Sequence, residues 1–88
     1  MKVKHVLPVL PAGVEPHGVS LLELIISPTG TVEIVRLRRG VQPSEPALDQ
    51  AAIDAVQQWL FTPTLVNGVA RRVRLYSTIN FNNASAWK

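Results

Sequence analysis

The stretch from Leu48 to Pro63, which reads LDQAAIDAVQQWLFTP, carries the clearest structural signal in the chain. Its apolar positions recur at helical spacing, namely Leu48, Ala51, Ala52, Ala55, Val56 and Trp59. Such spacing gives a helix one apolar stripe, and the small alanines let that helix approach a sheet closely. The segment Ser44-Glu45-Pro46 provides a capping residue and a first-turn proline, and Pro63 cannot continue a helix. We therefore predict a helix over about 46–60 that packs on a sheet.

Two strands are predicted before this helix. Residues 19–27 and 31–39 are rich in strand-forming residues, and Pro28-Thr29-Gly30 between them is typical of a tight turn. In the first strand Leu22, Leu24 and Ile26 share one face, and Val19, Leu21, Glu23 and Ile25 share the other. Because both faces are largely apolar, the second is either a partner surface or covered within the fold, and both interpretations stand. The alternation in the second strand breaks between Ile34 and Val35, which predicts a β-bulge there.

A third strand is predicted after the helix. Val66-Asn67-Gly68-Val69 is a turn signal, and residues 70–82 read as one long strand. One face of this strand holds Val73, Leu75, Ser77, Ile79 and Phe81, and the other holds Arg72, Arg74, Tyr76, Thr78 and Asn80. The order strand, strand, helix, strand predicts an α+β fold, with a three-stranded antiparallel sheet in the order 2-1-3 and one main helix on one face. The second and third strands are then the edges of the sheet.

Length and composition exclude several classes of protein. The chain has 88 residues, a formal net charge of +3, 47% hydrophobic residues and no cysteine. That length fits one domain, and the lack of cysteine excludes a disulfide scaffold and a cysteine-based zinc site. The apolar run Val19–Ile26 is too short for a transmembrane helix, which needs about 20 residues. The acidic residues are scattered, and His5 and His17 read as solvated loop residues, so we expect no enzyme, no cofactor and no metal site.

All the arginines fall in the predicted second and third strands, as Arg36, Arg38, Arg39, Arg71, Arg72 and Arg74. A basic sheet can bind a phosphate backbone, but Tyr76 is the one aromatic residue obviously available for base stacking. The two arginine clusters also fall on opposite edges of the predicted sheet. Charged side chains on edge strands discourage unwanted strand pairing, and this is the better interpretation. We therefore expect no nucleic acid as a partner.

An ordered set of motifs runs through most of the chain: Gly18 before the first strand, the Pro28-Thr29-Gly30 turn, the alanine-rich helix, Trp59-Leu60-Phe61-Thr62-Pro63, Asn67-Gly68 and a late Phe81. In this order and spacing the motifs resemble the carboxy-terminal, periplasmic domain of the TonB energy-transducer family. The resemblance covers residues 18–82. The ordered set with its spacing, rather than any single motif such as the family's Trp-x-Phe/Tyr-x-Pro signature at the end of the helix, carries the resemblance.

The sequence departs from the family pattern upstream of Gly18. The family has a Tyr-Pro followed by a short helix there, whereas this chain has Leu7-Pro8, followed by Pro11, Gly13 and Pro16. We predict that residues 9–17 are irregular, that the family's amino-terminal helix is lost, and that His5–Leu7 pairs as an edge strand. The chain then divides into an irregular segment 1–18, a TonB-like domain 19–82 and a polar tail 83–88 that Trp87 anchors.

The resemblance implies a periplasmic domain that captures the TonB box of TonB-dependent outer-membrane transporters. In such transducers an inner-membrane helix and a proline-rich spacer, which here would lie outside the chain, link this domain to an ExbB–ExbD-type proton-driven motor. The family captures its peptide on the edge of the last strand, so the residues implied are Arg72, Arg74, Tyr76, Thr78 and Asn80, with Leu7 and Pro8 as further candidates. The alternative is a structural module on another carrier protein that forms a homodimer through the same edges or through the apolar outer face.

Overall fold

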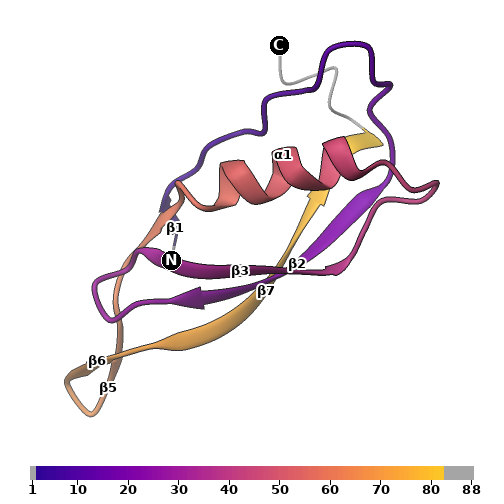
Figure 1. The fold of residues 1–88 in the computed structure, drawn as a ribbon. Coiled ribbons are helices and arrows are strands. Elements are labelled where there is room, and N and C mark those ends of the chain that lie inside the picture. Colours follow the sequence, from indigo (N-terminus) through magenta and orange to yellow (C-terminus); the bar gives the residue numbers. More distant parts are fainter. Residues whose placement is uncertain (1, 83–88) are drawn as a thin grey trace.

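The computed structural model describes residues 2–82 (Figure 1). Its elements in chain order are β1 (Lys2–Lys4), β2 (Val19–Ile26), β3 (Val32–Arg39), α1 (Pro46–Val56), β4 (Leu60–Phe61), β5 (Thr64–Val66), β6 (Val69–Arg71) and β7 (Val73–Asn80). The predicted tail 83–88, with Trp87 as its anchor, lies outside the described residues. The division of the chain into 1–18, 19–82 and 83–88 stays a prediction, although the first of these segments does contain a strand, β1.

The main sheet is antiparallel and has the order β3-β2-β7, so the predicted α+β fold with strand order 2-1-3 is confirmed. Between β2 and β7 the register is unbroken from Val19 opposite Asn80 to Ile26 opposite Val73. Between β2 and β3 it shifts twice, because Glu33 and then Arg38 are extra residues in β3.

The bulge predicted between Ile34 and Val35 is wrong in position. These two residues pair regularly with Ile25 and Leu24 of β2, on opposite faces of the sheet. The extra residue is Glu33, directly after Val32. Because of this extra residue, Val32 lies on the same face of the sheet as Val35, although the two are three positions apart. The sequence alternation therefore looks broken between Ile34 and Val35, whereas the bulge is at Glu33.

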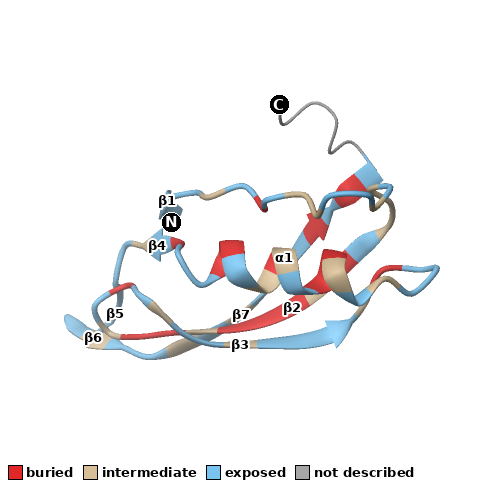
Figure 2. Ribbon diagram, turned by 45° about the horizontal axis from the view of Figure 1, so that its top comes forward, coloured by how far each residue is buried: buried red, intermediate tan, exposed pale blue. Residues whose placement is uncertain are grey.

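Helix α1 lies on one face of the sheet and buries its predicted stripe except for Ala51, which is half-buried (Figures 1 and 2). The core consists of Leu22, Leu24, Ile26, Val41, Leu48, Ala52, Val56, Trp59, Ile79 and Phe81. Glu45 is the N-cap residue but makes no side-chain capping hydrogen bond, and Pro46 opens the first turn.

The helix ends at Val56, earlier than the predicted residue 60. The reason is tertiary pairing of the residues that follow. The amide of Phe61 donates to the carbonyl of Gly30 at 2.9 Å, and Leu60 forms a β-bridge with Thr31. Because Leu60 and Phe61 extend to pair with the β2–β3 turn, the chain leaves the helix well before Pro63.

The segment of residues 5–17, called the strap below, contains no helix, and this confirms the prediction for residues 9–17. It runs beside α1 on the same side of the sheet (Figures 1 and 2). Leu10 and Val14 of the strap pack against the core. An extended strap therefore lies beside α1, at the place where the resemblance implies a second helix.

The strand predicted at His5–Leu7 is wrong, because the pairing residues are Lys2–Lys4, opposite β4. The carbonyl of Val6 serves another partner: it accepts a hydrogen bond from the indole Nε1 of Trp59 at 2.9 Å. His5 in turn stacks on the Trp59 ring, with 4.9 Å between ring centroids. The strap is thus attached to the end of the helix through one buried tryptophan.

The single long strand predicted over 70–82 is also wrong. It is interrupted at Arg72, and its first part, β6, forms a separate hairpin with β5. The predicted turn is confirmed, since Asn67 and Gly68 both have positive φ, 53° and 80°. Two successive residues of this kind form the type I′ turn that closes two-residue hairpins.

His17 is half-buried and more constrained than a solvated loop residue, contrary to the expectation from sequence. Its Nε2 lies 2.7 Å from the carbonyl oxygen of Pro43, and its Nδ1 lies 2.9 Å from that of Glu15. Carbonyl oxygens only accept hydrogen bonds, so both contacts are hydrogen bonds only when both ring nitrogens carry a proton. The bond to Pro43 is the main reason why the pKa of His17 is raised, and the bond to Glu15 adds to it.

We expect an NMR titration to give His17 a pKa above the ordinary value of about 6.5. His5 provides the internal control, because partial burial and then the charge of Lys2 lower its pKa. Since the pKa of His17 is raised in the folded state, its stabilising effect is complete below the ordinary pKa and is lost as the pH rises through the raised one. A pKa of His17 at or below that of His5 would contradict the two hydrogen bonds.

Candidate functional site

The outer edge of β7 is the candidate site. Among residues 2–82, β7 pairs with β2 on one side and with no strand on the other. The sheet has a second edge at β3, but that strand carries the extra residues Glu33 and Arg38. Bulges twist a strand and interrupt its row of hydrogen-bonding groups, which protects an edge from strand addition. The regular edge, and so the one suited to accept another strand, is β7.

The direction of the backbone groups in β7 follows from hydrogen bonds at the two ends of β2. The amide of Phe81 donates to the carbonyl of Gly18, and at the other end the amide of Ser27 donates to the carbonyl of Thr31, both at 2.8 Å. In an antiparallel ladder successive residues bond to alternate sides. Even-numbered residues of β2 therefore bond to β7, and odd-numbered ones bond to β3. It follows that the backbone N–H and C=O groups of four even-numbered residues of β7 point outward, namely those of Arg74, Tyr76, Thr78 and Asn80.

The structure brings the side chains predicted on the last strand to one region. Four of them, Arg74, Tyr76, Thr78 and Asn80, are exposed on β7, and the fifth, Arg72, is exposed immediately before it. Arg74 and Tyr76 lie on the sheet face opposite α1, because both reach Glu23 on that face. Asn80 uses its side-chain oxygen to accept a hydrogen bond from the amide of Asn82 at 2.9 Å.

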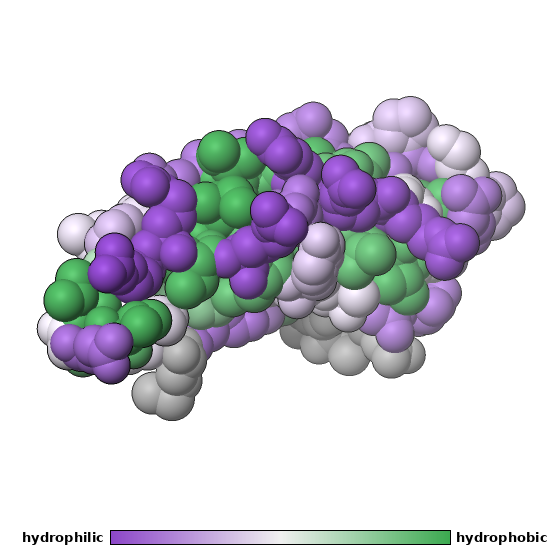
Figure 3. Space-filling model, turned by 90° about the horizontal axis from the view of Figure 1, so that it is seen from below, coloured by the Kyte–Doolittle hydropathy of each residue, from purple (hydrophilic) through white to green (hydrophobic). Residues whose placement is uncertain are grey.

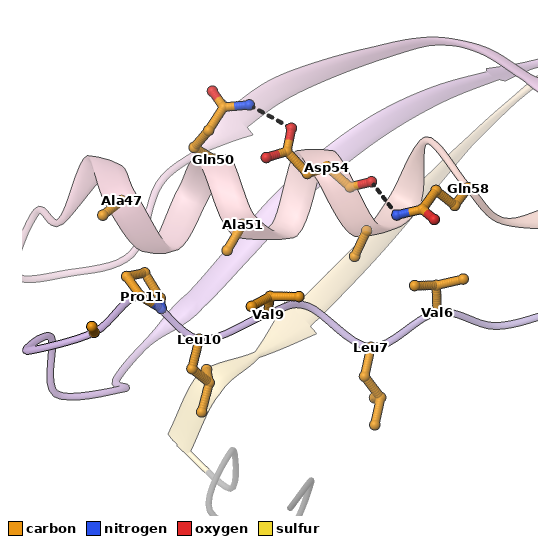
Figure 4. A pocket seen from close by; sticks show the side chains of 12 residues that line it. Val6, Leu7, Val9, Leu10, Pro11, Ala47, Gln50, Ala51, Asp54 and Gln58 are labelled. Atoms are coloured by element: carbon orange, nitrogen blue, oxygen red, sulfur yellow. Dashed lines mark hydrogen bonds between the residues drawn. The ribbon is translucent and has the colours of Figure 1, made fainter.

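The two upstream candidates lie elsewhere. Pro8 is buried, and Leu7 lines a groove between the strap and α1. This groove has a volume of about 560 Å³, and the strap side of it is entirely apolar, as Figure 4 shows. On the helix side it is lined by alanines together with Gln50, Asp54 and Gln58. The side-chain amide of Gln50 donates a hydrogen bond to the Asp54 carboxylate at 2.8 Å, and that of Gln58 donates to the backbone carbonyl of Asp54 at 3.3 Å. The polar groups on this side of the groove therefore partly satisfy one another.

Sequence reasoning missed the central role of Glu23 on the face opposite α1. This carboxylate is only 6% exposed, yet it lies in the middle of that face. Its oxygens lie 3.1 Å from Arg74 Nε, 4.0 Å from Arg38 Nη1 and 3.5 Å from the Tyr76 hydroxyl. An acidic residue within an apolar strand, with arginines in both neighbouring strands, was the available signal. Glu23 links β3 to β7 and positions Arg74 beside the outer edge.

A second ion pair joins the start of β7 to β3 on the exposed surface. Arg72 makes two hydrogen bonds to the carboxylate of Glu33, at 2.5 and 3.3 Å. The hydrogen bond from Arg72 holds the pKa of Glu33 below its ordinary value. Both side chains are substantially exposed, so this pair contributes little to stability.

No helix of the described residues covers the sheet face opposite α1, which Figure 3 shows from outside. Apolar and hydrophilic side chains alternate across it. Leu21 and Ile25 of β2 are half-buried on this face, while Ile34 of β3 and Tyr76 of β7 are exposed. The sequence left two interpretations of this apolar face, namely a partner surface or a face covered within the fold. Within residues 2–82 no helix covers it.

The chemistry of the described residues is limited. Among residues 2–82 no three His, Cys, Asp or Glu side chains gather as a metal site would require. Within the same residues, the helix is too short to cross a bilayer. The arrangement offers a sheet edge and a groove, and so it is suited to binding a peptide.

Comparison with known proteins supports this assignment of the fold. The family model of the Gram-negative bacterial TonB protein C-terminal region matches residues 14–83, which include the whole main sheet, the helix and the β5–β6 hairpin. No curated protein matches the chain. The match begins within the strap, downstream of Leu7-Pro8, where the sequence departs from the family pattern. The chain therefore belongs to the TonB C-terminal family, a family of periplasmic domains of energy transducers that interact with outer-membrane transporters.

Proposed function

We propose that this domain captures the TonB-box peptide of outer-membrane transporters by strand addition to the outer edge of β7. In the full-length protein a preceding segment tethers it to the inner membrane, where an ExbB–ExbD-type proton-driven motor supplies the force. The observation that carries the proposal is the unbroken register of β7, an edge strand of eight residues whose outward backbone groups have no strand partner within residues 2–82. The bulged β3 edge offers no equivalent row.

Strand addition suits a transducer for two physical reasons. Each outward-facing residue offers one donor and one acceptor, and each hydrogen bond adds about 0.5–1.5 kcal/mol net. A pull along the added strand loads all of these bonds together rather than one after another. Backbone pairing also tolerates different partner sequences, so one domain can serve several transporters.

The side chains beside the edge modulate binding in this proposal. Arg72 and Arg74 attract acidic residues of the peptide, but each already faces a carboxylate, Glu33 and Glu23 respectively. Acidic groups of the peptide must compete with these partners, and exposed charges are screened at physiological salt. Charge reversal at Arg74 is therefore expected to weaken binding mainly at low ionic strength.

The test compares two substitutions of Thr78, whose backbone points outward and whose side chain is exposed. Thr78→Pro removes one outward donor and adds bulk at the edge, and we expect it to weaken TonB-box binding about tenfold or more, which is about 1.4 kcal/mol. Thr78→Ala keeps the amide and is expected to bind within about twofold of the parent chain. Isothermal titration calorimetry with a synthetic TonB-box peptide measures both.

Two further proline variants sharpen the test. Arg74→Pro also acts on an outward position and is expected to weaken binding, whereas Ser77→Pro removes a bond to β2 and is expected to destabilise the fold. Circular dichroism separates loss of binding from loss of fold. If Thr78→Pro and Arg74→Pro are folded and bind the peptide like the parent chain, capture on β7 is wrong.

Homodimerisation through the same edge is the competing use, because a free antiparallel edge is complementary to a second copy of itself. Analytical ultracentrifugation with and without peptide distinguishes the two. Capture predicts that the peptide-bound domain is a monomer carrying one peptide. A dimer that persists in excess peptide and is lost in Thr78→Pro would favour the structural module.

A further inference from the structure

The β5–β6 hairpin exposes aliphatic side chains on both of its faces. Val66 pairs with Val69 on one face, and Leu65 pairs with Ala70 on the other. Leu65, Val66 and Val69 are 63%, 48% and 51% exposed. None of the three belongs to the core or packs against it. The hairpin lies at one end of the elongated molecule, beyond the main sheet (Figure 1).

An apolar tip with two exposed faces restricts what can cover it. A flat protein surface, including that of a second copy, covers one face of a two-stranded ribbon and leaves the other in water. A medium that surrounds the tip covers both. The polar head-group layer of a bilayer and the adjoining acyl chains form such a medium, and apolar side chains enter it to about 5–10 Å. Three residues of strand span about 10 Å, which matches that depth.

The charges at this end of the molecule complement anionic head groups. No acidic residue occurs after Asp54, so the hairpin and β7 contain only cationic charges. The carboxylate of Glu33, at the start of β3, is paired with Arg72. Arg71 closes the hairpin at its base, opposite Thr64. Lys4 of β1 lies at the same end, because β1 pairs with β4 just ahead of the hairpin (Figure 1). The ammonium group of Lys2 is engaged over the Trp59 ring instead. Each lysine or arginine near an anionic membrane surface favours binding.

We propose that the β5–β6 hairpin docks the domain on a bilayer that contains anionic phospholipids. Leu65, Val66 and Val69 enter the boundary between head groups and acyl chains, and Arg71 and Lys4 face the lipid phosphates. Only the tip enters, so the outer backbone edges of the ribbon stay within reach of water, as they must since neither edge of this ribbon is paired within residues 2–82. This contact uses none of the outward groups of β7 and is independent of peptide capture.

The test is co-sedimentation with two kinds of vesicle, one of phosphatidylcholine alone and one of phosphatidylcholine mixed with the anionic phosphatidylglycerol. We expect the parent chain to partition at least about tenfold more strongly into the anionic vesicles at low salt, with a clear loss as salt is raised. The double variant Leu65→Ser/Val66→Ser is expected to lose about tenfold, and Arg71→Glu a comparable amount at low salt.

Matched controls are Ile34→Ser and Arg36→Glu, which alter an exposed aliphatic residue and an arginine of β3. Both are expected to bind vesicles like the parent chain, and circular dichroism checks that every variant is folded. Equal partitioning into both kinds of vesicle, or unchanged binding of the double variant, would overturn the proposal. A loss as large in Ile34→Ser would place the contact on the sheet and overturn it as well. Failure here leaves peptide capture intact, because that is measured without lipid.

Discussion

Replacing Trp59 by alanine is expected to lower the free energy of unfolding by about 3–5 kcal/mol, as truncation of large buried aromatic residues does. Trp59 is 3% exposed and belongs to the core. Its indole Nε1 donates to the carbonyl of Val6 at 2.9 Å, and its ring contacts His5 and the ammonium group of Lys2, which lies 3.7 Å from the ring centroid. The substitution therefore leaves a cavity and also releases the strap from the end of α1.

Urea unfolding followed by circular dichroism measures this loss. A domain of this size is stabilised by only about 5–15 kcal/mol, so the variant is expected to be marginal or unfolded at 37 °C. Leu65→Ala provides the control, because Leu65 is exposed and outside the core, and we expect it to change stability by no more than about 0.5 kcal/mol. A Trp59→Ala variant that unfolds cooperatively with a loss below about 1 kcal/mol would contradict the role assigned to this residue.

Replacing Gly30 by alanine is expected to have a comparable effect through the backbone. Gly30 has φ +96° in the β2–β3 turn, and a Cβ added there would lie 2.0 Å from the carbonyl oxygen of Phe61. Positive φ costs an alanine about 1–2 kcal/mol. The clash with rigid backbone adds about 1–3 kcal/mol more, because the turn and β4 must separate. Their contact includes the hydrogen bond from the amide of Phe61 to the carbonyl of Gly30.

Gly68→Ala is the matched control for this prediction. Gly68 also has positive φ, +80°, but no atom lies within 4 Å of the position of its added Cβ. It should therefore show only the conformational cost of about 1–2 kcal/mol. The expected result in parallel urea unfolding is a clearly larger loss for Gly30→Ala. Equal losses in the two variants would show that the contact with Phe61 does not constrain the turn.

The parts of the fold with strong periodicity could be predicted from sequence. The stripe from Leu48 to Trp59, the turn at Gly30 and the alternation along β2 and β7 each need only local information, and together they give the helix and the three strands of the main sheet. The end of the helix could not be predicted in this way. Leu60 and Phe61 are compatible with a helix, and they leave it because Gly30 and Thr31 offer them backbone partners from a distant part of the chain.

The same limit applies to β1 and to the hairpin. The strand partner of Lys2–Lys4 is β4, an element that exists only because the helix ends early. The Asn67-Gly68 turn was evident, but its strands are only three residues long and read as part of a longer one. Short elements carry too few residues for a period to be recognised.

The face of β7 that carries the candidate residues was predictable, but the direction of their backbone groups was not. Alternation alone placed Arg74, Tyr76 and Thr78 on one face. Hydrogen bonds at the strand ends, such as that from the amide of Phe81 to the carbonyl of Gly18, determine whether the odd-numbered or the even-numbered residues of β7 bond to β2. No sequence pattern indicates which of the two sets does so. The choice between the edges likewise depends on the extra residues in β3, whose positions only the register shows.

Amide hydrogen exchange, measured by NMR with and without a TonB-box peptide, tests the central claim of capture on the edge of β7 most directly. Without peptide, the amides of Leu75, Ser77 and Ile79 bond to β2 and are expected to be protected, whereas those of Tyr76 and Thr78 exchange quickly. With saturating peptide, Tyr76 and Thr78 are expected to become protected, so that the alternation along β7 disappears, while the outer amides of β3 stay unchanged. Unchanged exchange at Tyr76 and Thr78 in the peptide-bound domain, or new protection along β3 instead, would contradict it.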